Sequence, residues 1–195
     1  TKYYQWFIRY ILNRSFGFWE RLGIHVVSDH FYQPVPNLRS LSDRLWETPS
    51  ALVGIDLDEQ SQITLLSLFA DAYKHEYDQF PTSKTSRPYD YYVNNGGFES
   101  VDGEILYCII RHFKPKKIIE IGSGNSTYLS ALAIQKNKEQ DPDYTCEFTA
   151  IEPYPNKVLQ DGFPGLSNLI KEPVQNVPLS TFEKLGEDDI LFIDS

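Results

Sequence analysis

Four short apolar runs in the second half of the chain predict a parallel β-sheet. They are separated by segments long enough to hold helices and read KIIEIG (117–122), EFTAIEP (147–153), NLIKEPV (168–174) and DILFIDS (189–195). Strands of a parallel sheet are covered on both faces, so their sequences are almost continuously apolar. The repeated order of strand and helix is typical of βαβ units. The sequence therefore predicts an α/β fold with a Rossmann-like, doubly wound parallel sheet.

The first half of the chain lacks such runs and is predicted as a mostly helical extension. Residues 1–50 are rich in aromatic side chains interrupted by arginines, a pattern that predicts a short amphipathic helix packing on the body of the protein or on a second subunit. A longer helix is expected to begin near Asp56, where Glu59 three residues later resembles a capping box. Its apolar face comprises Ile63, Leu66, Ala70, Tyr73 and Tyr77.

Residues 81–97 are polar, with two prolines, a double glycine and three tyrosines. A loop of this length in a compact domain is usually functional, so we predict a substrate lid or an oligomer contact. Ser100 is then expected to cap a helix that ends at Lys114–Pro115. The apolar stripe of that helix comprises Val101, Ile105, Ile109 and Phe113. We accordingly divide the chain into an extension, residues 1–97, and a ligand-binding domain, residues 98–195.

The turn after the first apolar run is expected to touch a ligand. In open α/β sheets ligands bind beyond the carboxyl ends of the strands, beside the first βα turn. Gly122 and Gly124 allow the backbone to approach such a ligand without a Cβ in the way. A P-loop requires a lysine after the second glycine, and residues 125–127 supply none. A dinucleotide fingerprint requires glycine or alanine where Thr127 stands, so neither a triphosphate nor a dinucleotide is favoured.

Two carboxylates at strand ends favour a ligand that is cationic at one end. Glu120 lies two residues before Gly122, where its charge would repel a pyrophosphate but would accept hydrogen bonds from an ammonium group or lie beside a sulfonium. Glu152 follows the second run, thirty residues after Gly122, where an acid can bind both hydroxyls of a ribose. Adenosine with a cationic amino-acid tail describes S-adenosylmethionine.

The segments IIEIGSGNST, AIEP and DILFIDS together resemble the class I S-adenosylmethionine-dependent methyltransferases, particularly the small-molecule O-methyltransferase-like branch. The resemblance covers about residues 98–195. It implies S-adenosylmethionine as the cofactor and methyl transfer to an oxygen atom of a small-molecule acceptor. The cofactor-binding residues that it implies are Glu120, Gly122, Ser123, Gly124, Asn125, Ser126, Thr127, Glu152, Gln175 and Asp194.

The same resemblance assigns a place to each of these residues. Residues 120–124 would line the methionine end of the cofactor, and residues 125–127 would open the following helix. Glu152 would hold the ribose, and Gln175 would lie near the adenine. Asp194 would face the methionine portion or the substrate, and it is the first candidate for a catalytic base. Asp90 and the tyrosines of the predicted lid are further candidates.

The resemblance also bears on metal binding and on the length of the whole protein. In related metal-dependent O-methyltransferases the acid that ends the fourth strand binds a divalent cation, so a metal at Asp194 stays open. The sheet of the family has seven strands, whereas this sequence stops after the fourth predicted strand. We therefore expect a fragment of a longer protein, and the absence of methionine at position 1 and elsewhere points the same way.

Composition limits the kinds of partner that we expect, and it leaves two alternative functions open. A net charge of −9 argues against a broad grip on nucleic-acid phosphates. No apolar stretch approaches the roughly 20 residues of a membrane span, and the two cysteines suit a reducing, cytoplasmic setting. The expected partners are a small-molecule substrate and a second copy of the chain. The alternatives are a cofactor-binding or partner-binding module without catalysis and, behind it, an NAD-dependent oxidoreductase.

Overall fold

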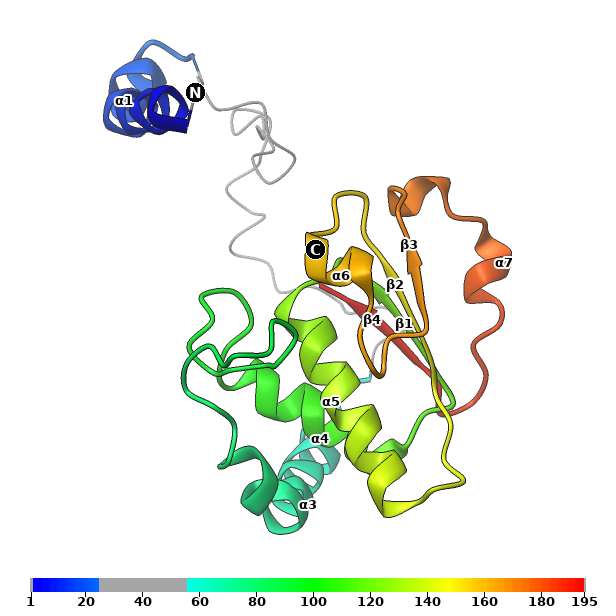
Figure 1. The fold of residues 1–195 in the computed structure, drawn as a ribbon. Helices are drawn as coiled ribbons and strands as arrows, with labels where there is room; N and C mark the ends of the chain where they lie inside the picture. Colours follow the sequence, from blue (N-terminus) through cyan, green and yellow to red (C-terminus); the bar gives the residue numbers. More distant parts are fainter. Residues whose placement is uncertain (1, 25–55, 195) are drawn as a thin grey trace. The chain divides into compact units, whose positions relative to one another are not determined.

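The computed structural model of the protein describes residues 2–24 and 56–194 (Figure 1). The chain divides into two units, residues 1–57 and residues 58–195. In the first unit, α1 (Lys2–Arg21) confirms the helix predicted in the aromatic-rich start and is longer than expected. Several of its described apolar side chains, including Phe16 and Phe18, are exposed. The remaining elements all belong to the second unit.

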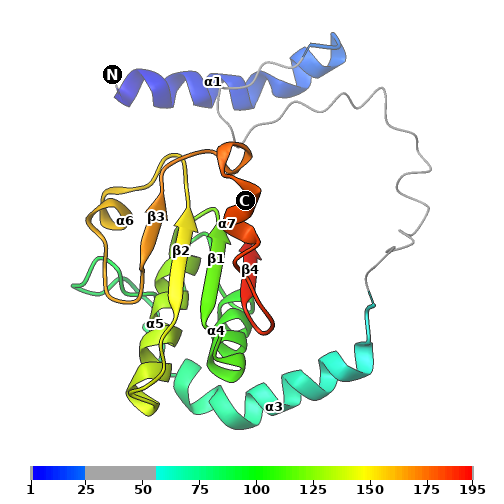
Figure 2. The ribbon, with the colours of Figure 1, turned by 90° about the vertical axis from the view of Figure 1, so that its right-hand side faces the viewer.

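A four-stranded parallel sheet forms the centre of residues 58–195 (Figure 2). Its strands are β1 (Lys117–Ile121), β2 (Glu147–Ile151), β3 (Asn168–Ile170) and β4 (Ile190–Ile193). Their order across the sheet is β3-β2-β1-β4, and every neighbouring pair is parallel. The predicted α/β fold and all four predicted strands are therefore confirmed, while the further strands implied by the resemblance stay a prediction.

Helices cover the two faces of the sheet unequally. One face packs on α4 (Asp102–Phe113) and α5 (Asn125–Gln140), and α3 (Glu59–Tyr77) packs on α4 (Figure 2). The other face meets a smaller apolar cluster from the short helices that follow β3. These short elements are η2 (Val174–Asn176) and α7 (Leu179–Phe182), and α6 (Lys157–Asp161) precedes β3. Cover on both faces explains the apolar sequences of β1 and β2, whereas Leu191 and Ile193 on one face of β4 are exposed.

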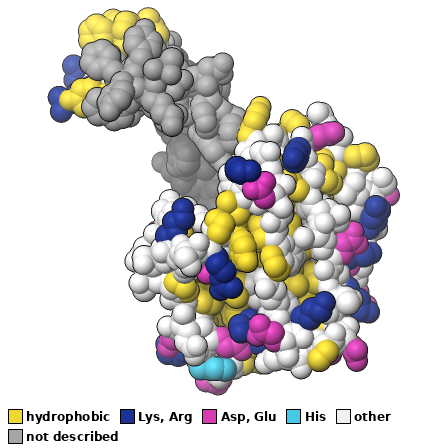
Figure 3. Space-filling model, viewed as in Figure 1, with side chains coloured by type: hydrophobic (Ala, Val, Ile, Leu, Met, Phe, Trp, Pro, Cys, Tyr) yellow, Lys and Arg dark blue, Asp and Glu magenta, His cyan; other side chains and the backbone are white. Residues whose placement is uncertain are grey.

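Charged side chains of both signs are mixed on the face drawn in Figure 3. There the side chains of lysine and arginine are interspersed with those of aspartate and glutamate, and apolar side chains reach the surface between them. Over the described residues of this face the basic side chains form no continuous patch.

Two predicted helix caps are wrong. The N-cap of α3 is Asp58, not Asp56, because the Asp58 carboxylate accepts hydrogen bonds from both the backbone N–H and the hydroxyl of Ser61. The N-cap of α4 is Val101, and Ser100 makes no capping bond. The Ser100 hydroxyl instead donates to Oε1 of Glu104 at 2.6 Å, a charge-assisted bond.

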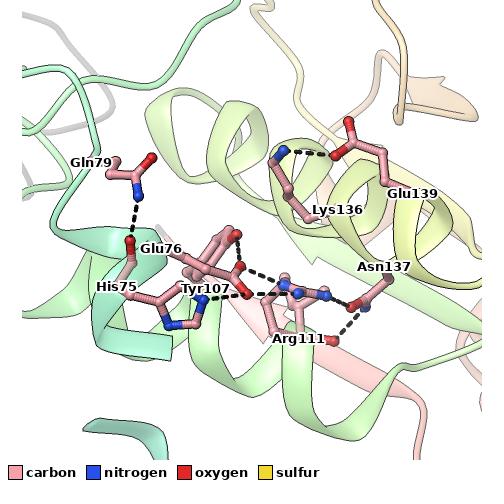
Figure 4. A network of polar contacts seen from close by, with 9 residues as sticks. His75, Glu76, Gln79, Tyr107, Arg111, Lys136, Asn137 and Glu139 are labelled. Carbon is pink, nitrogen blue, oxygen red and sulfur yellow. Dashed lines mark hydrogen bonds and ion pairs between the residues drawn. The ribbon is translucent and has the colours of Figure 1, made fainter. Parts of the chain in front are cut away.

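A buried network around one ion pair joins α3, α4 and α5 (Figure 4). The guanidinium of Arg111 in α4 is 1% exposed and donates from Nε and NH2 to the two carboxylate oxygens of Glu76 in α3, at 2.9 and 2.8 Å. Arg111 also donates to the side chain of Asn137 in α5, and the Tyr107 hydroxyl donates to Glu76 at 2.6 Å. Burial alone would raise the pKa of Glu76, but the hydrogen bonds from Arg111 and Tyr107 outweigh it and lower that pKa.

Substituting Gly165 with alanine is expected to lower the free energy of unfolding by about 2–3 kcal/mol. Gly165 has φ +99°, and an added Cβ would lie 2.8–2.9 Å from atoms of Ala131 in α5, including its backbone. Gly162→Ala is the matched control, because Gly162 has φ +73° but nothing within 4 Å of an added Cβ. The Gly162→Ala variant tests backbone strain alone, which should lower the free energy of unfolding by about 1 kcal/mol. Equal losses for the two variants in urea unfolding would show that the contact with Ala131 is unimportant.

Candidate functional site

The carboxyl ends of the strands bring the predicted acids to one edge of the sheet. Backbone hydrogen bonds extend past the strands, from the N–H of Gly122 to the carbonyl of Ile151 at 3.0 Å and from the N–H of Asp194 to the carbonyl of Ile121 at 2.8 Å. Glu152 directly follows β2 at the same edge. Since β1 lies between β2 and β4, the chain reverses its direction of winding beside β1. This is the position at which open α/β sheets bind ligands.

Glu120, the penultimate residue of β1, is a fully buried acid without a partner. Its side chain is 0% exposed, and no hydrogen bond of ordinary geometry reaches either carboxylate oxygen. Burial raises the pKa of Glu120 to about 8. The nearby hydroxyls of Ser126 and Thr127 lower the pKa in part, and the charge of Asp194 raises it further. An uncompensated buried acid is costly to a fold and is therefore a signal of function.

The glycine turn between β1 and α5 leaves room beside this acid. Gly122 has φ +86°, a backbone conformation that favours glycine. This conformation explains why a glycine stands at position 122. Gly124 has an extended backbone, and a Cβ added there would meet nothing within 4 Å. The Gly124 N–H donates to the Thr127 hydroxyl at 2.9 Å, so Thr127 closes the turn. The hydroxyls of Ser123 and Ser126 are buried without a partner.

The other predicted site residues differ in how they are held. Glu152 is 8% exposed, and its Oε1 accepts a hydrogen bond of 2.8 Å from the backbone N–H of Tyr154. Asn125 begins α5 directly after the turn, and Asp194 is exposed directly after β4. Gln175 is exposed on η2, after β3, and β2 separates β3 from β1 in the sheet. The structure thus brings together Glu120, the turn, Glu152 and Asp194, with Gln175 beyond them.

Residues 94–98 overlap the end of the segment predicted as a lid or an oligomer contact, but the sequence did not predict where they pack. A Cβ added to Gly97 would lie 3.5 Å from Nδ2 of Asn125, and the ring of Phe98 packs edge-on against that of Phe192 in β4, with centroids 6.0 Å apart. This segment therefore packs on β4 through Phe98 and lies near the start of α5 at Gly97. The sequence NNGG hints at a tight turn, but nothing in it specifies where the turn packs.

Among residues 2–24 and 56–194, no group of three or more His, Cys, Asp or Glu side chains could hold a metal ion. No helix in the same part of the chain has both the length and the apolar character needed to cross a membrane.

The fold and this edge of the sheet define a Rossmann-like α/β protein. No protein-family model matches the chain, and no solved structure matches it. An uncharacterized protein of Archaeoglobus fulgidus is 37% identical over 168 residues, which cover 83% of this chain and 74% of the archaeal protein. The chain therefore belongs to the same family as this archaeal protein.

Proposed function

We propose that the protein binds S-adenosylmethionine at the carboxyl edge of its sheet and transfers the methyl group to an oxygen atom of a small-molecule acceptor. The observation that carries the proposal is Glu120, a fully buried carboxyl without a hydrogen-bond partner, beside the glycine turn at the point where the winding of the sheet reverses. Such a group favours a ligand that brings its own cation and hydrogen-bond donors.

The residues at this edge fit the amino-acid end of that cofactor. An ammonium group has three donors to satisfy, and the unpartnered oxygens of Glu120, Ser123 and Ser126 are suitable acceptors. Gly124 has no Cβ, and the space around the position of one is empty, so a ligand can approach the backbone there. Glu152, held by the backbone of Tyr154, supplies a carboxylate for ribose hydroxyls. A pyrophosphate would instead lie beside the acidic side chain of Asp194, which disfavours NAD.

The chemistry asks little of the protein beyond position and a dry site. The bound cofactor supplies a methyl group on a positively charged sulfur. The chain holds the acceptor in line with that methyl group and excludes water. Asp194 is exposed at the edge of the site, where it can take the proton of an acceptor hydroxyl. We therefore propose Asp194 as the general base.

Calorimetry on the full-length protein is expected to detect binding of S-adenosylmethionine and S-adenosylhomocysteine. Glu120→Gln should weaken both affinities about 10- to 100-fold, the equivalent of one lost charge-assisted hydrogen bond. Glu139→Gln is the control, because Glu139 is an exposed carboxylate in the last turn of α5 that pairs with Lys136. Its affinities should equal those of the wild type. Absence of binding to either ligand, or tighter binding of NAD, would overturn the proposal.

A further inference from the structure

The segment of residues 94–98, here called the 94–98 turn, lies against both sides of the candidate site. On one side Gly97 approaches Asn125, the first residue of α5, which follows the glycine turn directly. On the other side the ring of Phe98 packs on Phe192 of β4. Phe192 is the residue of β4 that pairs in register with Glu120 of β1. Paired residues of neighbouring parallel strands point to the same face, so Phe98 packs beside the buried acid's own position.

The side chain of Asn95 organises this turn. Its Nδ2 donates to the carbonyls of Tyr92 and Phe98 at 2.8 and 2.6 Å. Its Oδ1 accepts from the backbone N–H groups of Gly97 and Phe98 at 3.0 and 2.7 Å. One amide side chain therefore satisfies four backbone groups of a segment without regular secondary structure. Removing it would leave those groups to water or to other conformations.

Two neighbouring side chains support the same conformation. The buried Tyr91, which is 2% exposed, donates from its hydroxyl to the carbonyl of Phe98 at 3.1 Å. The carboxylate of Glu99 accepts from the backbone N–H of Gly96 at 2.7 Å. Gly96 has φ +79°, and a Cβ added there would meet nothing within 4 Å. The side chains of Tyr91 and Glu99 thus anchor the turn, while Gly96 faces open space.

We infer that the 94–98 turn is a fixed wall of the ligand site and that Asn95 is the positioning residue that holds it. The identity of the ligand, S-adenosylmethionine, rests on the proposed function, whereas the placement of the wall rests on the contacts of Gly97 and Phe98. A wall held in place before binding lowers the ordering cost of the ligand and keeps water from Glu120. This role differs from the mobile lid expected from sequence.

The test compares Asn95→Ala with two controls in the full-length protein. Asn95→Ala should weaken binding of S-adenosylmethionine about tenfold, since the site is no longer preorganised. Glu139→Gln alters an exposed side chain in the last turn of α5, outside the 94–98 turn, and should leave the affinity unchanged. Tyr144→Phe removes a buried hydrogen bond of 2.7 Å to the carbonyl of Pro115, at the opposite end of the sheet, and controls for general loss of stability. Its affinity should also stay within twofold of the wild type.

Amide hydrogen exchange supplies a readout that needs no ligand. In Asn95→Ala the amides of residues 122–128 should exchange faster than in the wild type, whereas Tyr144→Phe should leave them protected. Unchanged exchange in Asn95→Ala, or equal effects of Asn95→Ala and Tyr144→Phe on exchange or affinity, would overturn the inference. If the wild type binds no S-adenosylmethionine, the proposed function fails, and exchange alone then decides whether the 94–98 turn is a wall.

Discussion

Replacing Arg111 with methionine is expected to lower the free energy of unfolding by about 3–5 kcal/mol. The substitution keeps much of the side-chain volume but removes the cation that pairs with Glu76 through two hydrogen bonds. The carboxylate of Glu76 is then left beside α4 with a hydrogen bond from the Tyr107 hydroxyl and with the exposed His75 imidazole 4.0 Å away. The oxygen of Asn137 loses its donor in the same step. Urea unfolding at neutral pH measures the loss.

Arg87→Met is the matched control for this prediction. Arg87 also pairs with an acid, Asp90, at 3.1 Å, but its side chain is 69% exposed. Exposed ion pairs contribute at most about 1 kcal/mol, so this variant should change stability little. The double variant Glu76→Gln/Arg111→Met should be more stable than Arg111→Met alone, because no unpaired buried charge remains. Equal effects of Arg111→Met and Arg87→Met would show that burial does not strengthen the pair.

The pH dependence of the same pair follows from the lowered pKa of Glu76. A carboxyl whose pKa is lower in the folded state stabilises the protein above its ordinary pKa of 4.5 and loses that contribution as the pH falls. Arg111→Met removes the cation that lowers this pKa. The difference in stability between the wild type and Arg111→Met should therefore shrink in acid.

The sheet could be predicted because its signal is local. Four apolar runs of the right length mark β1 to β4, and a parallel sheet places all their carboxyl ends at one edge. The grouping of Glu120, Glu152 and Asp194 follows from that geometry alone. The buried, unpartnered state of Glu120 does not follow from it, because it depends on how α5 covers β1.

The features that escaped prediction depend on contacts between distant residues. Arg111 and Glu76 are 35 residues apart, and the periodicity of each helix says only that one face is covered. The 94–98 turn is defined by where Gly97 and Phe98 lie, near α5 and against β4.

One feature escaped prediction for a local reason. The N-cap of α3 is Asp58 and not Asp56, since Ser61 offers two donors to Asp58. A search for Asp or Ser followed by glutamate overlooks such a serine partner.

Glu120→Gln is expected to make the ligand-free protein more stable than the wild type at alkaline pH. Glutamine has nearly the shape of a protonated glutamate, so the two proteins should have similar stability near pH 5. In the wild type the unfolded chain ionises Glu120 near its ordinary pKa of 4.5, whereas the folded protein keeps the proton up to about pH 8. Stability that depends on this bound proton is complete below pH 4.5 and is lost as the pH rises through 8.

The size of this effect follows from the separation of the two pKa values. Between these two pKa values, each pH unit lowers the free energy of unfolding of the wild type by up to about 1.4 kcal/mol. The total decrease is at most about 5 kcal/mol. Urea unfolding of the ligand-free proteins at intervals from pH 5 to pH 9 should give free energies for the wild type that fall increasingly below those of Glu120→Gln. Glu139→Gln, which changes an exposed carboxylate, should follow the wild type. Parallel profiles for the wild type and Glu120→Gln would mean that a protein group already compensates the Glu120 charge, and the main argument for a cationic ligand would then be lost.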